Sequence, residues 1–267
     1  MDGFMQPVTL TFMALLLAHL LADFPLQSQW IARNKGSRLR ALGSHGLIHW
    51  VCAWACLLCF AGAHPLSWRA QALVAAYAAA HLLIDKSKCW FTAWTTKDTA
   101  AVFSADQALH VLMIGIASLL LTATSPRVLR QIFPLPLSAR VHVLEIATVY
   151  LAVVVPGGYL IRYLTKNFRS TLDDESESRG RPAGKGLKNA GLYIGYLERF
   201  LIVTAIAAQS ATLVGLILTG KSIARFPEFK KASFAEYFLV GTLLSISLAL
   251  VGGLLLQKLL YGAIVFK

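Results

Sequence analysis

The stretch HLLADFPLQ, residues 19–27, closes the first long apolar run of the chain, MQPVTLTFMALLLAHLLADF, residues 5–24. That run has the length that an α-helix needs to cross the hydrocarbon core of a bilayer, about 20 residues. His19 and Asp23 lie four positions apart within it, so a helix presents both side chains on one face. A buried aspartate costs about 2.5–3.5 kcal/mol even on insertion scales, so Asp23 is expected to face a partner.

The composition of the whole chain indicates a membrane protein. Of the 267 residues, 57% are hydrophobic and 14% are charged, and the mean hydropathy is +0.61. Soluble domains carry about 25% charged residues. We expect an all-α, polytopic helical membrane protein with about seven transmembrane helices, the first four forming a bundle around a polar site. The apolar segments lie near residues 8–27, 43–62, 68–88, 102–123, 141–163, 189–219 and 234–262.

Two polar stretches divide these segments. TSPRVLRQIFPLPLS, residues 124–138, is rich in proline, and TKNFRSTLDDESESRGRPAGKGLK, residues 165–188, mixes charge with Ser, Gly and Pro. Such compositions favour loops over packed structure. We therefore expect a membrane core at residues 1–125 that carries the polar site. Residues 126–267 are expected to hold further membrane helices and a cytoplasmic loop at about 165–188.

The basic residues predict the orientation. The net charge is +12, which in a soluble protein would point to nucleic acid. Here most lysines and arginines lie in loops, which favours membrane lipids as partners and argues against nucleic acid. Loops after the first, third and fifth segments hold fourteen of them, against eight in the opposite loops. This bias predicts an N-terminus outside and a C-terminus in the cytoplasm, although residues 220–233 argue against it.

Four short motifs share one spacing. HLLAD, HGLIH, HLLID and DQALH each hold two His or Asp residues at positions i and i+4. The first and third segments end on the predicted inner side, and the second and fourth begin there. The eight side chains are therefore expected at one depth near the cytoplasmic interface: His19, Asp23, His45, His49, His81, Asp85, Asp106 and His110.

Imidazole and carboxylate ligands together suit a divalent metal, with zinc favoured over iron or manganese. Eight ligands exceed the need of one tetrahedral zinc. The set therefore fits two metals, or one metal whose histidines are oriented by carboxylates. The alternative is a polar network without metal, in which Asp23, Asp85 and Asp106 relay protons through the histidines.

The four motifs together resemble a bacterial membrane protein family known as domain of unknown function 3307, over about residues 10–115. GLYIGYLERFLI, residues 191–202, is similar to the C-terminal portion of its longer members. The resemblance implies a multi-pass protein of the bacterial inner membrane with a shared polar site, and it implies no activity. By ligand type alone, the pattern is also similar to membrane-bound metal-dependent hydrolases.

Our leading hypothesis is a membrane-embedded, metal-dependent hydrolase that acts at the cytoplasmic face. A metal-bound water would attack an ester, amide or phosphoester of a lipid-linked or anionic substrate. Asp106 or Glu198 would act as the catalytic base, although a structural ion pair explains Glu198 equally well. Lys86 and Lys88 follow Asp85 and could hold a substrate phosphate or carboxylate, but anchoring at the interface is the simpler interpretation.

Other functions use the same residues. A transporter or channel for divalent metals or protons would need polar residues along its whole path, and the outer halves of the first four segments are nearly all apolar. A di-iron oxidase would be rich in glutamate, and the first five segments hold only Glu145. A signalling protein with a structural metal is the last alternative. Separately, we expect an ion-pair cluster at the end of the sixth segment remote from Glu198: Lys221, Arg225 and Glu236.

Overall fold

The computed structural model describes residues 2–61, 67–124, 135–168, 190–230 and 232–264. Within these residues every regular element is a helix, which confirms the all-α prediction. The chain forms two compact units, Met1–Leu151 and Ala152–Lys267. The predicted cytoplasmic loop at about 165–188 lies outside the described residues from residue 169 onward.

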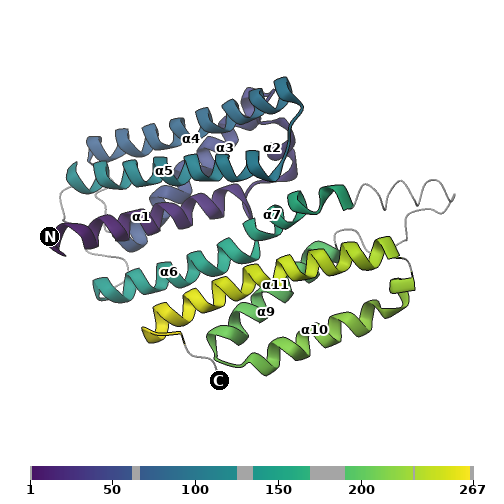
Figure 1. Ribbon diagram of the computed structural model, residues 1–267. Coiled ribbons are helices and arrows are strands. Elements are labelled where there is room, and N and C mark those ends of the chain that lie inside the picture. Colours follow the sequence, from purple (N-terminus) through teal and green to yellow (C-terminus); the bar gives the residue numbers. More distant parts are fainter. Residues whose placement is uncertain (1, 62–66, 125–134, 169–189, 231, 265–267) are drawn as a thin grey trace. The chain divides into compact units, whose positions relative to one another are not determined.

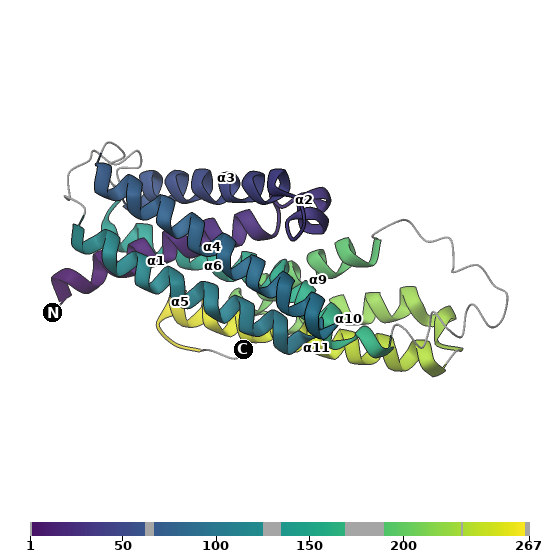
Figure 2. The same cartoon turned by 90° about the horizontal axis from the view of Figure 1, so that it is seen from above.

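The first unit is built on four long helices: α1 (Asp2–Asp23), α3 (Leu39–Cys56), α4 (Trp68–Thr95) and α5 (Ala100–Thr124). Helix α1 packs on α3 and α5, and α4 packs on the same two helices, so the four close into a ring (Figures 1 and 2). Successive helices run in opposite directions. This ring is the four-helix bundle that the sequence predicted.

One half of the bundle is a close-packed apolar core. Leu15 of α1, Leu57 after α3, Val74 of α4 and Ile114 of α5 are all fully buried there. Leu15 and Val74 precede the His/Asp motifs of α1 and α4, whereas Leu57 and Ile114 follow the motifs of α3 and α5. The antiparallel order therefore collects the apolar halves at one end and the four motifs at the other.

Two local features position the end of the bundle that carries the four His/Asp motifs. The short helix α2 (Gln29–Asn34) begins at Ser28, whose hydroxyl accepts a hydrogen bond from the main-chain N–H of Ile31, as N-cap residues do. Helix α3 approaches α4 closely at Gly46, where an added Cβ would lie 2.8 Å from Leu82 Cδ1. A small residue at this point lets the two helices bring their histidines together.

Helix α6 (Leu137–Val154) is followed by α7 (Pro156–Leu164), and the break falls inside the fifth predicted segment. Pro156 has no N–H, so it cannot continue the hydrogen-bond ladder of α6. The guanidinium of the buried Arg199 donates two hydrogen bonds to the Val154 carbonyl, at 3.1 and 2.8 Å. Arg199 therefore finds its partner in the main chain at this break.

The second unit also contains α9 (Ala190–Ala207), α10 (Ala211–Arg225), η2 (Phe226–Lys230) and α11 (Ala232–Tyr261). Helix α9 packs on both α10 and α11. The turn between α9 and α10 includes Gln209 at φ 59°, a left-handed conformation uncommon for residues other than glycine. The apolar segment at 189–219, which is long enough to include an interfacial turn, contains such a turn between α9 and α10, and α10 folds back along α9.

This hairpin corrects the expected ion-pair cluster. Lys221 of α10 pairs with Glu198 of α9, so it does not lie at the end remote from Glu198.

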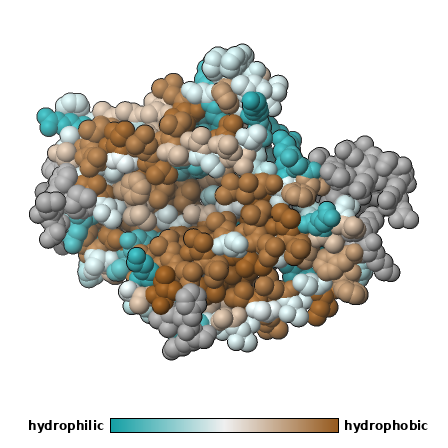
Figure 3. All heavy atoms as spheres, in the orientation of Figure 1, coloured by the Kyte–Doolittle hydropathy of each residue, from teal (hydrophilic) through white to brown (hydrophobic). Residues whose placement is uncertain are grey.

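Six spans among the described residues are long and apolar enough to cross a membrane. Apolar residues cover much of the face seen in Figure 3. Helix α4 has 28 residues but contains the charged residues Asp85, Lys86 and Lys88, and α10 has only 15. The prediction of a polytopic helical membrane protein is confirmed by the six spans: Gln6–Asp23, Leu39–Ala61, Ala100–Thr124, Leu137–Leu164, Ala190–Ala207 and Ala232–Tyr261.

Candidate metal centre

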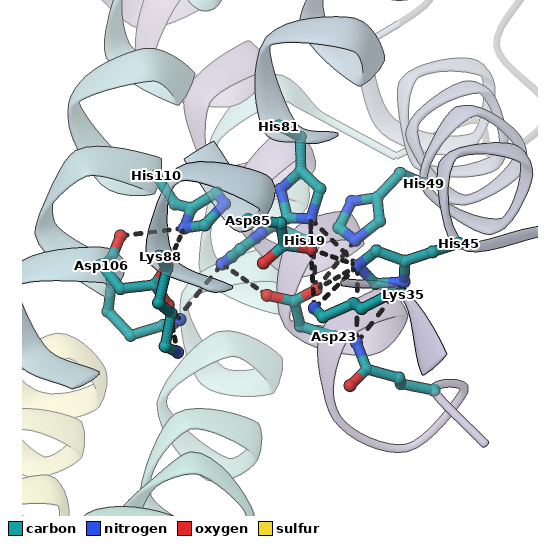
Figure 4. Close-up of polar contacts among 12 residues, drawn as sticks. His19, Asp23, Lys35, His45, His49, His81, Asp85, Lys88, Asp106 and His110 are labelled. Atoms are coloured by element: carbon teal, nitrogen blue, oxygen red, sulfur yellow. Dashed lines mark hydrogen bonds and ion pairs between the residues drawn. The ribbon is translucent and has the colours of Figure 1, made fainter. Parts of the chain in front are cut away.

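The four helices of the first unit bring all eight predicted ligands into one buried cluster (Figure 4). No more than 7% of any of these side chains is exposed. The imidazoles of His45, His49 and His81 turn toward Asp23, while Asp106 and His110 lie at the opposite side of the cluster (Figure 4). The i, i+4 pairing and the alternating helix directions therefore produce the convergence that the sequence predicted.

Four of these side chains form a cage. His45 Nε2 lies 3.2 Å from His81 Nε2, 3.2 Å from Asp23 Oδ1 and 2.9 Å from Asp85 Oδ2. His81 Nε2 lies 3.3 Å from Asp23 Oδ1 and 3.4 Å from Asp85 Oδ2. Ligand atoms at about 2.0–2.1 Å from a tetrahedral zinc lie roughly 3.3 Å from one another. These five separations fit one ion at the centre of the cage.

A second group shares Asp23 with the cage. His49 Nε2 lies 2.9 Å from Asp23 Oδ1, and His19 Nε2 lies 3.7 Å from Asp23 Oδ2. His81 lies within reach of both groups, but one ring nitrogen can bind only one ion. Asp23 Oδ1 lies near His49 as well as near the cage, and Asp23 Oδ2 lies near His19, so this carboxylate could serve both groups. The second group then supplies three ligands, His19, His49 and Asp23.

A third group holds Asp85, Asp106 and His110. The Nδ1 atom of His110 lies 2.8 Å from the main-chain oxygen of Asp106. A carbonyl only accepts, so Nδ1 carries the proton and Nε2 keeps its lone pair. That Nε2 is buried and has no hydrogen-bond partner among the described residues, and the same holds for Asp106 Oδ1. This is the tautomer and environment of a metal-binding histidine.

Two lysines place positive charges beside the carboxylates of the cluster. The Lys35 ammonium donates a hydrogen bond to Asp85 Oδ2 at 2.6 Å, and the Lys88 ammonium donates one to Asp106 Oδ2 at 2.9 Å. Their side chains are 14% and 25% exposed, so both reach from the surface into the cluster. Burial lowers the pKa of Lys35, but the carboxylates of Asp85 and Asp23 outweigh burial and raise the pKa above its ordinary value.

Sequence reasoning missed three members of the cluster. Gln27 Nε2 lies 3.4 Å from both ring nitrogens of His45, and Gln107 Nε2 donates to Asp106 Oδ2 at 3.1 Å. Both glutamines lie within motifs already quoted, HLLADFPLQ and DQALH. Lys35 was counted only as a loop charge, and its distance along the chain from any motif gave no signal.

Glu198 lies in the second unit, where its carboxylate pairs with Lys221. It is not among the residues that the first unit brings together. Its catalytic role, like that of Asp106, stays a prediction.

Fold and site define a class: a helical membrane protein with buried His/Asp groups that could hold metal ions. Residues 11–134 match the family model described as "Protein of unknown function (DUF3307)". This match confirms the resemblance carried by the four motifs, and it includes all eight candidate ligands. Comparisons with curated proteins and with solved structures found no match.

Proposed function

We propose that the protein is a membrane-embedded, metal-dependent hydrolase that binds two divalent ions, with zinc favoured over iron or manganese. The observation that carries the proposal is the set of five ligand separations of 2.9–3.4 Å around His45 and His81. The neighbouring group of His19, His49 and Asp23 offers three ligands. Catalytic zinc sites keep three protein ligands and leave the fourth position to water or substrate.

The proposed chemistry is hydrolysis by a metal-activated water. A metal lowers the pKa of bound water to about 7. The water oxygen forms a bond to carbon or phosphorus, and the bond to the leaving oxygen or nitrogen breaks. Asp106 takes the proton from the water and passes it to the leaving atom. Asp106 suits this role because it lies outside the first two groups and its Oδ1 is buried without a hydrogen-bond partner among the described residues.

The apolar half of the bundle favours a hydrolase over a transporter. Among the described residues of that half, the buried hydroxyls of Thr11 and Ser118 donate to carbonyls of their own helices, Pro7 and Gly115. Such contacts satisfy each hydroxyl locally. A transit path needs polar side chains that continue across the membrane, and this half of the bundle supplies an apolar core in its place.

We further propose a bacterial inner membrane location with the site at the cytoplasmic face. A hairpin of α9 and α10 returns the chain to the side from which it entered, so residues 220–233 join the inner loops. Eighteen lysines and arginines then lie in inner loops, against four in outer loops and two, Lys258 and Lys267, at the outer end of the chain, which strengthens the positive-inside bias. Helix α11 then ends outside, so this proposal replaces the expected cytoplasmic C-terminus. Alkaline phosphatase fused to the C-terminus should be active, and a fluorescent C-terminal GFP fusion would contradict it.

Metal content tests the proposed function. The full chain is purified in detergent without chelators, and bound metals are measured by mass spectrometry. We expect about one to two ions per chain, and none in a His45→Ala/His49→Ala variant. The matched control is His142→Ala, because His142 is exposed and pairs with Glu145.

An intact protein without stoichiometric metal would contradict the proposed metal-dependent hydrolase and favour a proton relay through the same residues. If metal is present, a proteoliposome assay separates transport from catalysis. Metal flux without turnover of any ester, amide or phosphoester would rule against the hydrolase.

A further inference from the structure

Each of the two lysines holds a carboxylate of the proposed site. Lys35 holds Asp85 Oδ2, which is also an atom of the four-residue cage. Lys88 holds Asp106 Oδ2 in the third group. An ion at Asp85 would share that carboxylate with the Lys35 ammonium and place two positive charges side by side. Neighbouring positive charges in a buried site are unfavourable, so they favour an anion between them.

The formal charges indicate how much negative charge that anion must carry. With neutral histidines, the three carboxylates and two lysines leave the cluster with one net negative charge. Two divalent ions change the total to three positive charges. A phosphomonoester carries about two negative charges near neutral pH, with a second pKa near 6. A carboxylic ester or an amide is neutral at the scissile bond and would leave the positive charge uncompensated.

We propose that Lys35 and Lys88 bind the phosphate group of a phosphomonoester substrate beside the metal ions. This inference rests on the proposed hydrolase and names its substrate class. The two lysines come from different parts of the chain, Lys35 from the end of α2 and Lys88 from α4. Both are only partly exposed and both point into the cluster (Figure 4). Lys86, two residues before Lys88, is exposed and provides a natural contrast.

The reaction balances with these residues, the proposed metal ions and one water molecule. The oxygen of the activated water forms a bond to phosphorus, and the bond from phosphorus to the alcohol oxygen breaks. The proton that Asp106 removes from water passes to that oxygen, so an alcohol leaves and inorganic phosphate remains. The lysines stabilise the negative charge on the phosphoryl oxygens throughout, as fixed cations do in phosphoryl transfer.

Inorganic phosphate, the reaction product, is the probe. It is titrated calorimetrically into the detergent-solubilised full chain that carries its bound metal, and into chelator-treated protein. We expect binding only with metal present. Lys35→Gln and Lys88→Gln should each weaken it at least about tenfold, because a hydrogen bond to a charged group contributes about 1.5–3 kcal/mol. Lys86→Gln should change it less than about twofold, and Lys35→Arg should retain it because the charge is kept.

Each other outcome contradicts the inference. Metal-loaded protein that does not bind phosphate would overturn the substrate class and leave the metal centre standing. Equal phosphate binding in the parent and in both glutamine variants would overturn the role of the lysines. A chain without metal would remove the proposed function and this inference together.

Phosphate release then distinguishes two sources of the substrate. One arm uses phosphatidylcholine vesicles that contain phosphatidate, and the other uses glycerol 3-phosphate in solution. Release from the vesicles alone identifies a lipid headgroup, and release in solution identifies a soluble phosphomonoester. Failure to release phosphate in both arms, with cleavage of a neutral ester, would overturn the proposal.

Discussion

The two units bury charged side chains in different ways. In the second unit the contacts are few: Glu198 has Lys221, and Arg199 has the Val154 carbonyl and the Ser245 hydroxyl. In the first unit a single polar atom lies close to polar atoms of several other residues. The Nε2 atom of His45 alone lies within 3.4 Å of atoms of Asp23, Asp85, His81, Lys35 and Gln27.

This difference distinguishes the structural contacts of the second unit from the proposed metal site of the first. A ring nitrogen has one proton or one lone pair, so it can satisfy one partner at a time. Contacts that match one donor to one acceptor hold helices together, as between Lys221 and Glu198. Crowded donors and acceptors satisfy one another poorly, and a metal ion resolves the conflict because it accepts several lone pairs at once.

The largest effect is expected at Asp23. Asp23→Asn removes the charge and one ligand oxygen from two groups, so metal should be lost completely. The loss should exceed the roughly 10- to 100-fold reduction in affinity that follows removal of a residue that only supports a ligand. Glu198→Gln, the matched change in the second unit, should leave metal content unchanged by mass spectrometry. Metal loss in both variants would erase the distinction between the units.

The next effect is expected at Asp106, which acts as base in the proposed reaction. Asp106→Asn should keep the bound metal but lower kcat about 100- to 10,000-fold, the usual contribution of general base catalysis. KM should change little, because Lys35 still binds the phosphate. Steady-state phosphate release measures both constants. A variant that loses its metal would identify Asp106 as a ligand and would contradict its role as base.

A smaller effect is expected at Arg199. Arg199→Met leaves the Val154 carbonyl without its donors, which costs about 1–3 kcal/mol for a buried acceptor. The thermal unfolding midpoint in detergent should fall, while metal content stays the same. Arg162→Met is the control, because Arg162 is exposed. Metal loss in Arg199→Met would mean that the second unit supports the site.

The smallest effect is expected at Gly46. A Cβ there would lie 2.8 Å from Leu82 Cδ1, so Leu82 or α3 must shift and His45 moves slightly from His81. We expect Gly46→Ala to weaken metal affinity by less than about tenfold, below the usual effect of altering a ligand's support. Gly43→Ala lies on the same helix with no atom within 4 Å of the added Cβ. Competition with a chelating dye should find no change in that control.

The sequence predicted the bundle and the cluster because both follow from simple periodicity. Spacings of i and i+4 fix a face, and alternating helix directions fix a depth, so eight residues could be assigned from the sequence alone. The lysines could not be assigned in this way. Lys35 reaches Asp85 through the path of the short helix α2, and no periodic pattern encodes the path of a connection.

The second unit was harder to predict for a different reason. The turn between α9 and α10 contains neither glycine nor proline, and Gln209 adopts a left-handed conformation there. Tertiary packing of α10 on α9, including the pair of Lys221 with Glu198, outweighs this local cost. At Pro156 the signal was visible, yet the two helices that it separates still read as one apolar segment.

The order of the ligands along the chain bears on biosynthesis. All eight lie between residues 19 and 110, and the compact first unit ends at Leu151. Chains emerge from the ribosome N-terminus first, at about 5–20 residues per second, and domains fold as units. The complete ligand set is therefore available several seconds before translation ends. If the proposed metal centre forms, the nascent chain can acquire its ions while α9, α10 and α11 are still being made.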